Sequence, residues 1–412
     1  VYDFSLGNPS VPAPDGVQNT MLNLLQNGDS VKLHGYTSAQ GAEITREKIA
    51  QNINARFNVG VDKNDIYMTC GAAASLTISI NALACDGDEF IAIAPYFPEY
   101  KVFVEGQRAK LKVVPADTKA FQIDFSALES LINENTAGVI INSPNNPSGT
   151  VYSKETLIEL ANLLSDKSKE IGHPIYIISD EPYRELVYGG VKVPFLTAYY
   201  DDTIVCYSFS KSVSLPGERI GYIAVGPECE GAEVLADMCG QISRGTGHNC
   251  PPSIIQLAVA EVLDLTSDLS VYETNMNILY KELTSLGFEC VKPGGTFYMF
   301  PKALEKDAIA FSEKAKKYDL ILWDHGGGPF GYGVDSIYGG EIKGELEGMN
   351  ALAISYDDPI APAKVLKEYA EKIESFEILA GYLDGKVVDK ATVMQLADIP
   401  SKEVLLAKFL GS

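Results

Sequence analysis

The chain is poor in basic side chains. Its 412 residues include 33 Lys and Arg against 55 Asp and Glu, for a formal charge of -22. Nucleic acids and anionic membranes attract proteins through basic surfaces, so this charge argues against both as partners. The sequence also shows no signal peptide and no apolar run of the roughly 18 residues that a spanning helix needs. These absences predict a cytoplasmic protein.

Cysteine and histidine are sparse and scattered. The seven cysteines include no CxxC pair and lie mostly in apolar stretches. This pattern is typical of buried thiols in a reducing compartment and argues against a disulfide framework or a zinc site. Because the four histidines are equally dispersed, the sequence predicts no metal centre.

Short apolar strands alternate with helical patterns from residue 40 to about 225. This alternation is typical of an α/β fold in three layers, a mostly parallel sheet with helices on both faces. The predicted strands are Ile66–Thr69, Phe90–Ala94, Lys110–Val114, Gly138–Asn142, Ile175–Ser179, Thr203–Tyr207 and Ile220–Val225.

Helical patterns separate and follow these strands. The predicted helices are Gly41–Phe57, Gly71–Ala84, Lys154–Ile171, Glu230–Gln241, Pro251–Leu265, Leu269–Leu286 and Asp307–Tyr318, with short strands at Glu289–Lys292 and Thr296–Phe300. A smaller α/β part is expected at the C-terminus, with strands at Ala351–Tyr356 and Glu377–Leu383 around a helix at Pro362–Ile373. The length favours one large domain with a smaller one beside it. We predict boundaries that give segments 1–30, 31–265, 266–345 and 346–412, the third including a glycine-rich junction.

Lys211 lies in the most informative segment, SFSKSVSLPGERIG, directly after a predicted strand. Open α/β sheets bind their ligands at the carboxyl ends of strands. An amine there can form a Schiff base with an aldehyde cofactor, and Ser208, Ser210 and Arg219 can bind an anion such as a phosphate. A surface lysine in a serine-rich turn would look the same, so the interpretation depends on the other strand ends.

Asp180 and Tyr183 follow another predicted strand in the segment DEPY. A carboxylate there can keep a pyridinium nitrogen protonated, and the phenol can reach the ring oxygen O3′. An Asp after a strand is also a common helix cap. Asn146 follows a third strand and could share O3′, although Asn-Pro-Gly segments also form ordinary turns.

Three further segments fit the same ligand. Gly71, Ala72 and Ala73 join a strand to a helix, and backbone N–H groups at a helix N-terminus bind phosphate where small side chains let it approach. Tight packing of strand against helix would need the same residues. Phe97 offers a face for stacking on a flat ring, as a core aromatic also would. Tyr36 precedes a predicted helix, and no role in local structure accounts for a tyrosine at this position.

The order and spacing of these motifs resemble those of the fold-type I enzymes that use pyridoxal 5′-phosphate (PLP). Within that group they resemble the class I/II aminotransferases, which include the aspartate aminotransferases. The resemblance covers residues 1 to about 322. It implies a PLP enzyme that moves an amino group from an amino acid to a 2-oxo acid.

The resemblance also implies a role for each motif. Lys211 would be the Schiff-base lysine, Asp180 would pair with the pyridine nitrogen, and Tyr183 would bind O3′. The other implied site residues are Asn146 at O3′, Ser208, Arg219 and the backbone at Ala72 and Ala73 at the phosphate, with Gly71 and Ser210 beside them, Phe97 on the ring, and Gly7 on the substrate side. Tyr36 matches a tyrosine that family members lend to the phosphate of the neighbouring subunit, which implies a homodimer.

The C-terminal part departs from this pattern. Family members bind the amino acid's α-carboxylate with an arginine in a C-terminal strand. The corresponding segment here is LAISY, with Ala353 at the arginine position, and none of the six arginines follows Arg244. Residues from about 346 to 412 resemble the large-subunit ribosomal protein at the base of the ribosomal stalk. The sequence therefore indicates a chimeric chain whose aminotransferase activity is impaired.

Two other functions stay open. A different PLP reaction, either a C–S β-elimination or a decarboxylation, would use the same anchoring residues, because substrate-side groups set the reaction type. A non-catalytic, ribosome-associated chimera is suggested by the tail alone. The acidity of the chain and its lack of basic clusters argue against that second function.

Overall fold

The computed structural model describes residues 2–3, 7–305, 308–316, 320–321, 363–364, 367, 380–383 and 386–397. The chain divides into two compact units, Val1–Asp324 with Gly328–Phe330, and His325–Gly327 with Gly331–Ser412. This division falls within the glycine-rich junction. The finer domain boundaries given above stay predictions.

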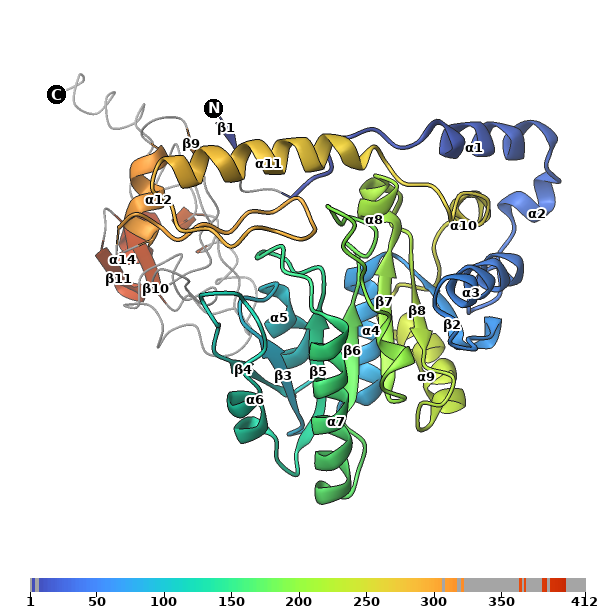
Figure 1. The fold of residues 1–412 in the computed structure, drawn as a ribbon, viewed down its shortest axis with the longest axis horizontal. Helices are drawn as coiled ribbons and strands as arrows, with labels where there is room; N and C mark the ends of the chain where they lie inside the picture. Colours follow the sequence, from blue (N-terminus) through green and yellow to red (C-terminus); the bar gives the residue numbers. More distant parts are fainter. Residues whose placement is uncertain are drawn as a thin grey trace. The chain divides into compact units, whose positions relative to one another are not determined.

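A seven-stranded sheet forms the centre of the first unit, in the order β2-β8-β7-β6-β5-β3-β4 (Figure 1). The strands from β3 to β7 pair in parallel, whereas β8 runs antiparallel to both β2 and β7. Every predicted strand of this sheet is confirmed, with ends shifted by at most two residues. The strands are β2 (Ile66–Thr69), β3 (Glu89–Ile93), β4 (Lys110–Val114), β5 (Thr136–Asn142), β6 (Tyr176–Asp180), β7 (Thr203–Ser208) and β8 (Gly221–Val225).

Helices cover both faces of the sheet. Successive residues of a strand point to opposite sides, and both sides of these strands carry apolar residues that the helices bury. On β6, Ile177 packs with residues of α6 and α7, whereas Ile178 packs with residues of α4 and α5. The predicted α/β class is therefore confirmed. The helices of this unit are α1 (Asp15–Asn27), α2 (Ser30–His34), α3 (Glu43–Phe57), α4 (Ala72–Leu83), α5 (Glu99–Glu105), α6 (Phe125–Leu131), α7 (Lys154–Ile171), α8 (Phe209–Ser212), α9 (Ala232–Gly245), α10 (Ser253–Val259), α11 (Leu269–Ser285) and α12 (Ala308–Lys316).

Helix α7 shows how local sequence sets these boundaries. The side chain of Ser153 accepts a hydrogen bond from the backbone of Thr156 and caps the first turn. Leu157, Leu160 and Leu164 recur at helical spacing and are fully buried against the sheet. The helix ends at Gly172, whose φ of 85° suits glycine.

Among the described helices, none is long and apolar enough to cross a membrane.

Two predictions for the segment after the sheet are wrong. Helix α10 is shorter than the predicted helix 251–265, and the segments 289–292 and 296–300 are not strands. Within the first segment, Cys290 forms an isolated bridge with Pro301, and Gly295, just before the second, forms one with Val187. The second segment starts at Thr296, whose backbone N–H bonds to the Leu186 carbonyl, 2.8 Å away, instead of pairing within a hairpin.

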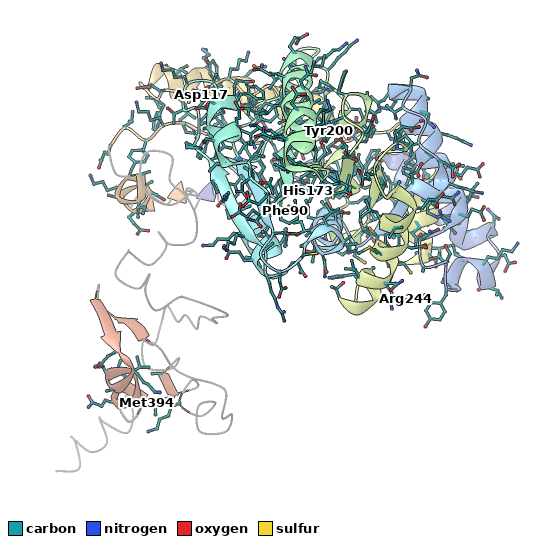
Figure 2. The ribbon with its side chains drawn as sticks, turned by 90° about the horizontal axis from the view of Figure 1, so that it is seen from below. Phe90, Asp117, His173, Tyr200, Arg244 and Met394 are labelled. Atoms are coloured by element: carbon teal, nitrogen blue, oxygen red, sulfur yellow. The ribbon has the colours of Figure 1, made fainter. Side chains whose placement is uncertain are left out.

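Strand β1 (Tyr2–Asp3) pairs in parallel with β9 (Leu320–Ile321) in the first unit. The second unit contains an antiparallel pair, β10 (Ala380–Leu383) with β11 (Lys386–Asp389), followed by α14 (Lys390–Ala397). Met394 of α14 packs beside the buried Val393 and Ala363 (Figure 2). Strand β10 agrees with the predicted strand 377–383, and β11 was not predicted. The predicted strand 351–356, with Ala353, lies outside the described residues.

The packing on β6 predicts the cost of removing core side chains. Ile177→Ala and Ile178→Ala should each lower the free energy of unfolding by about 2–5 kcal/mol, because both side chains are fully buried on opposite faces. Val102→Ala, at an exposed site on α5, should change it by less than about 0.5 kcal/mol. Urea titration followed by circular dichroism measures all three. Equal stability of the β6 variants and the control would contradict this packing.

Candidate active site

The register of the sheet aligns three strand ends at one edge. Asn142 at the end of β5 lies opposite Asp180 at the end of β6, and Asp180 lies opposite Cys206 of β7. Lys211 follows β7 on the short helix α8. Segments far apart in the sequence therefore place an amide, a carboxylate and an amine at the carboxyl edge of the sheet, where open α/β folds bind ligands.

Asp180 is a buried carboxyl group with one oxygen occupied and one unpaired. Its Oδ2 accepts a hydrogen bond from the Tyr100 hydroxyl at 2.5 Å and lies 3.4 Å from Asn142 Nδ2. The same Asn142 amide donates to the backbone oxygen of Asp180 at 2.8 Å. The Oδ1 atom is buried and has no partner. Burial raises the pKa of Asp180 to about 7.

Tyr183 and Asn146 are buried near this edge. The Tyr183 hydroxyl donates to the Tyr298 hydroxyl at 3.1 Å. Asn146 is fixed through its backbone N–H, which donates to Asn142 Oδ1 at 2.6 Å, while its own Oδ1 is buried without a partner. A buried polar atom without a partner costs roughly 1–3 kcal/mol, so this edge of the sheet is suited to a polar ligand.

Lys211 is half-buried, and its amine donates to the Gly7 carbonyl at 2.7 Å. The amine lies 5.3 Å from the centre of the Phe297 ring. Burial, with a smaller effect of the Arg219 charge, lowers the pKa of Lys211 to about 8. A much larger fraction of this amine than of an ordinary lysine is then neutral and nucleophilic near physiological pH.

Gly71 and Arg219 form one wall at the start of α4. Gly71 is the N-cap of this helix with a φ of 93°, and a Cβ there would lie 2.8 Å from Arg219 Nη2. The first N–H groups of a helix lack acceptors within the helix and can bind an anion, which places the backbones of Ala72 and Ala73 at this site. The Arg219 guanidinium is exposed and also donates to the carbonyls of Cys70 and Pro216.

The remaining predicted residues divide into two groups. Ser208 and Ser210 are buried on either side of the β7–α8 boundary, beside Lys211 in sequence. Phe97 is half-buried and meets the Tyr100 ring edge-on, with centroids 5.8 Å apart. Tyr36, by contrast, is fully exposed at 105%, so a single chain does not enclose it in the site.

Three residues of this edge escaped the sequence analysis. Asn142 is the last residue of the predicted strand that precedes the strand of Asp180. Pairing these two strands in parallel would have placed Asn142 beside Asp180. Tyr100 lies four residues after Tyr96 on α5, and nothing in the sequence indicates its contact with Asp180. Tyr298 belongs to the segment wrongly predicted as a strand. Its hydroxyl lies where a Cβ on Gly7 would be, so any larger residue at position 7 would have to displace the Tyr298 side chain.

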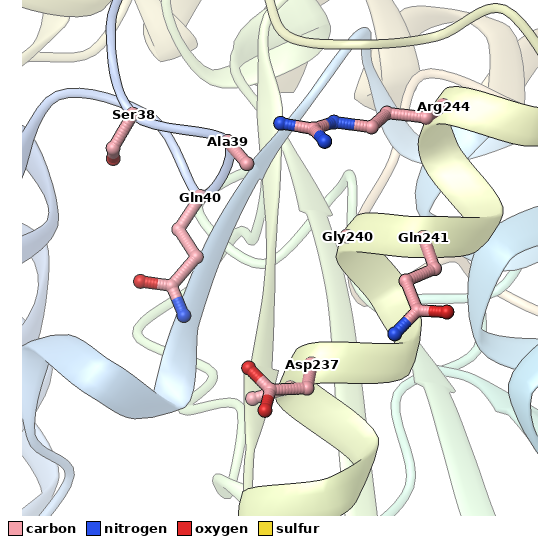
Figure 3. Close-up of a pocket in the computed structure, with 8 residues that line it drawn as sticks. Ser38, Ala39, Gln40, Asp237, Gly240, Gln241 and Arg244 are labelled. Atoms are coloured by element: carbon pink, nitrogen blue, oxygen red, sulfur yellow. The ribbon is translucent and has the colours of Figure 1, made fainter.

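A separate cavity of about 490 Å³ lies between the Ser38–Gln40 loop and α9 (Figure 3). Arg244, Asp237 and Gln241 line it. It contains none of the predicted site residues.

Across the described ranges, no group of three His, Cys, Asp or Glu side chains is arranged to hold a metal ion.

Comparisons with known proteins place most of the chain in one family. The model of the family described as aminotransferase class I and II matches residues 1–327. A probable aspartate/prephenate aminotransferase of Aquifex aeolicus is 31% identical over 324 residues, which are 76% of this chain and 77% of that protein. An aspartate aminotransferase of Thermotoga maritima is 31% identical over 330 residues, or 78% of this chain and 82% of that protein.

A solved structure is closer in sequence than these two proteins. An amino transferase from Eubacterium rectale is 56% identical, with a TM-score of 0.77 over 79% of this chain and 82% of that chain. The structure of the Thermotoga maritima aspartate aminotransferase gives a TM-score of 0.70 at 29% identity, over 79% of this chain and 83% of that one.

The raised pKa of Asp180 predicts a stability that falls with pH. Because the folded pKa of about 7 exceeds the unfolded value of 3.8, the folded chain binds an extra proton between these values. Its stability therefore falls as pH rises from about 4 to 7 and levels off above 7. Between about pH 5 and pH 8 this group should cost roughly 3 kcal/mol in the cofactor-free chain. Asp180→Asn should remove that part of the dependence. Parallel pH profiles of the two chains in urea unfolding would contradict the assignment.

Proposed function

Because the chain belongs to the class I and II aminotransferase family, we propose that the residues at the carboxyl edge of its sheet hold PLP and carry out its chemistry. The chain is a PLP-dependent aminotransferase, which moves an amino group from an amino acid to a 2-oxo acid. The names of its relatives do not favour a β-lyase or a decarboxylase.

One observation carries the assignment of the site: the unpaired, buried Oδ1 of Asp180. A protonated pyridine nitrogen is the donor that such an oxygen lacks, and its charge would favour the ionised carboxylate despite burial. The residues present therefore fit PLP. Asp180 would hold the ring nitrogen, and Tyr183 and Asn146 would hold O3′.

The phosphate would lie against Arg219 and the start of α4. Gly71 leaves room there, the backbone N–H groups of Ala72 and Ala73 donate, and the guanidinium supplies charge. Ser208 and Ser210 would contribute hydroxyls from the other side. Phe97 would cover the ring, and Gly7 would border the substrate.

When bound, PLP supplies an aldehyde that reacts with amines and a ring that withdraws electrons from the substrate. Lys211 provides the amine for that aldehyde, and its lowered pKa keeps a nucleophilic fraction. Its hydrogen bond to Gly7 holds the amine at the substrate side. Once substrate has displaced it, the neutral amine can take the proton from the substrate's Cα.

We also infer that two copies of the chain form the working enzyme, in the cytoplasm. Tyr36 is fully exposed, and neighbouring apolar side chains on α1 and α2 are exposed too, Val31 at 81% and Leu25 at 54%. An exposed apolar patch of this kind favours a protein partner. A second copy would cover these side chains and receive the Tyr36 phenol at its phosphate site. All seven cysteines are free thiols, as a reducing compartment would require.

Residues from about 346 to 412 would then derive from a different protein, the ribosomal stalk-base protein that they resemble. Two observations support this proposal. The family match ends at residue 327, and the second compact unit begins in the same region.

Lys211 should be the residue to which PLP becomes covalently fixed. Borohydride treatment of the loaded chain should leave a pyridoxyl group on Lys211, located by peptide mass spectrometry. Lys211→Ala should carry none, and Lys101→Ala, at an exposed site, should label like the parent chain. A fully labelled Lys211→Ala chain would refute the assignment.

The missing C-terminal arginine should slow turnover without preventing PLP binding. A bidentate guanidinium is among the strongest partners of a carboxylate, and no arginine follows Arg244 here. We expect the chain to transaminate aspartate more slowly than about 1 per second, a common enzyme rate. Replacing the residues after Leu322 with the ending of the Thermotoga maritima relative should restore turnover. A rate of 1 per second or more in the original chain would show that another group binds the carboxylate.

Tyr36 should act across the dimer. Sedimentation should find two chains per particle, and Tyr36→Ala should raise the dissociation constant of PLP about tenfold, the effect of losing one strong phosphate contact. Val102→Ala should leave both unchanged. A monomer that is fully loaded with PLP would exclude this role.

A further inference from the structure

Tyr100 is the one side chain that contacts Asp180 from the helical layer among the hydrogen bonds of the described residues. Its hydroxyl donates to Asp180 Oδ2 at 2.5 Å, a short bond of the kind that charge strengthens. The other polar contact of this oxygen, to Asn142 Nδ2, is 3.4 Å long and therefore weak. The position of the carboxyl group thus depends mainly on the Tyr100 hydroxyl.

The Tyr100 ring is itself held rigidly. The residue is 1% exposed in the core formed by α4, α5 and the sheet. Tyr96 stacks on its face at 6.1 Å, and Phe97 meets its edge at 5.8 Å. Burial raises the pKa of Tyr100 well above its ordinary value. The hydroxyl therefore stays protonated, and able to donate, around neutral pH.

The other groups that face Asp180 offer no equivalent donor. Glu181, next in the chain, bears a charge of the same sign and raises the pKa of Asp180. From β7, Cys206 contributes a buried thiol whose pKa is raised by burial. Tyr183 donates its hydroxyl to Tyr298. Among these neighbours, Tyr100 alone donates a short hydrogen bond that stabilises the ionised carboxylate.

We propose that Tyr100 is a positioning residue for Asp180. By occupying Oδ2, it leaves Oδ1 as the one carboxylate oxygen presented to the cofactor, and it sets how readily this carboxyl group ionises. The inference rests on the proposed function for the link from Asp180 to PLP. The contact between Tyr100 and Asp180 can be tested without PLP.

The first test uses the cofactor-free chain. Tyr100→Phe removes the donor that stabilises the carboxylate, so the pH at which stability stops falling should move up by about one unit. The matched control is Tyr200→Phe. Tyr200 is also buried, and its hydroxyl donates to the Ile175 carbonyl at 2.8 Å, near the other end of β6 (Figure 2). Tyr200→Phe should lower the free energy of unfolding by the same amount at every pH. A Tyr100→Phe profile that levels off at the same pH as the parent profile would overturn the proposal.

The second test measures PLP affinity in a double-mutant cycle. Tyr100→Phe should raise the dissociation constant about tenfold when Asp180 is present, equivalent to about 1.4 kcal/mol. It should have no effect in an Asp180→Ala chain, because the partner is gone. Equal effects in both backgrounds would mean that Tyr100 supports the fold alone. Normal PLP affinity of Asp180→Ala itself would refute the proposed function and leave the first test standing.

A third measurement needs no change at Tyr100, in case that variant does not fold. The infrared difference between the cofactor-free parent and Asp180→Asn, at about pH 6, isolates the carbonyl stretch of protonated Asp180. The proposal predicts the lowered frequency of a hydrogen-bonded acid. The frequency of a free buried acid would overturn it.

Discussion

The parallel register of β5, β6 and β7 is the constraint on which the site depends. It aligns Asn142, Asp180 and Cys206 in a row, although 64 residues separate the first from the last in sequence. Backbone hydrogen bonds hold these strands, and apolar side chains bury both of their faces. A slip of one residue would turn Asp180 to the opposite face of the sheet. The position of the carboxylate is therefore as rigid as the core itself.

A buried ionic network holds the segment that follows Asp180. Arg184 Nε donates to Glu181 Oε2 at 2.5 Å, and its Nη1 donates to the Tyr222 hydroxyl at 3.0 Å. The guanidinium also stacks on Tyr207 of β7, 4.6 Å from the ring centre. A buried pair of this kind adds little net stability, but losing one partner typically costs about 3–5 kcal/mol. The network ties the β6 and β7 ends together, and with them the segments that carry Tyr183 and Lys211.

The Lys211 amine is bordered by segments with no regular structure. Backbone hydrogen bonds attach residues 294–296 to Gly149 and Leu186, in the connections after β5 and β6. This attachment places Phe297 beside the Lys211 amine and Tyr298 beside Tyr183. Gly7 comes from the opposite end of the chain and closes the same side through its carbonyl. Irregular backbone is tolerated here because the neighbouring loops satisfy its polar groups.

The amino-acid sequence alone determined the α/β class, the seven strands and which strand ends carry Lys211, Asp180 and Asn146, because alternating apolar periods and strand-end polar residues are local signals. It also revealed the lack of an arginine after Arg244. Sequence could not reveal the shape of residues 294–296, whose backbone N–H groups bond to carbonyls more than a hundred residues away in the chain. Nor could it reveal the contact of Tyr100 with Asp180, which joins a helix to a strand end 80 residues later. Only the tertiary structure decided these contacts, because burial and partner geometry depend on chain segments that no local pattern brings together.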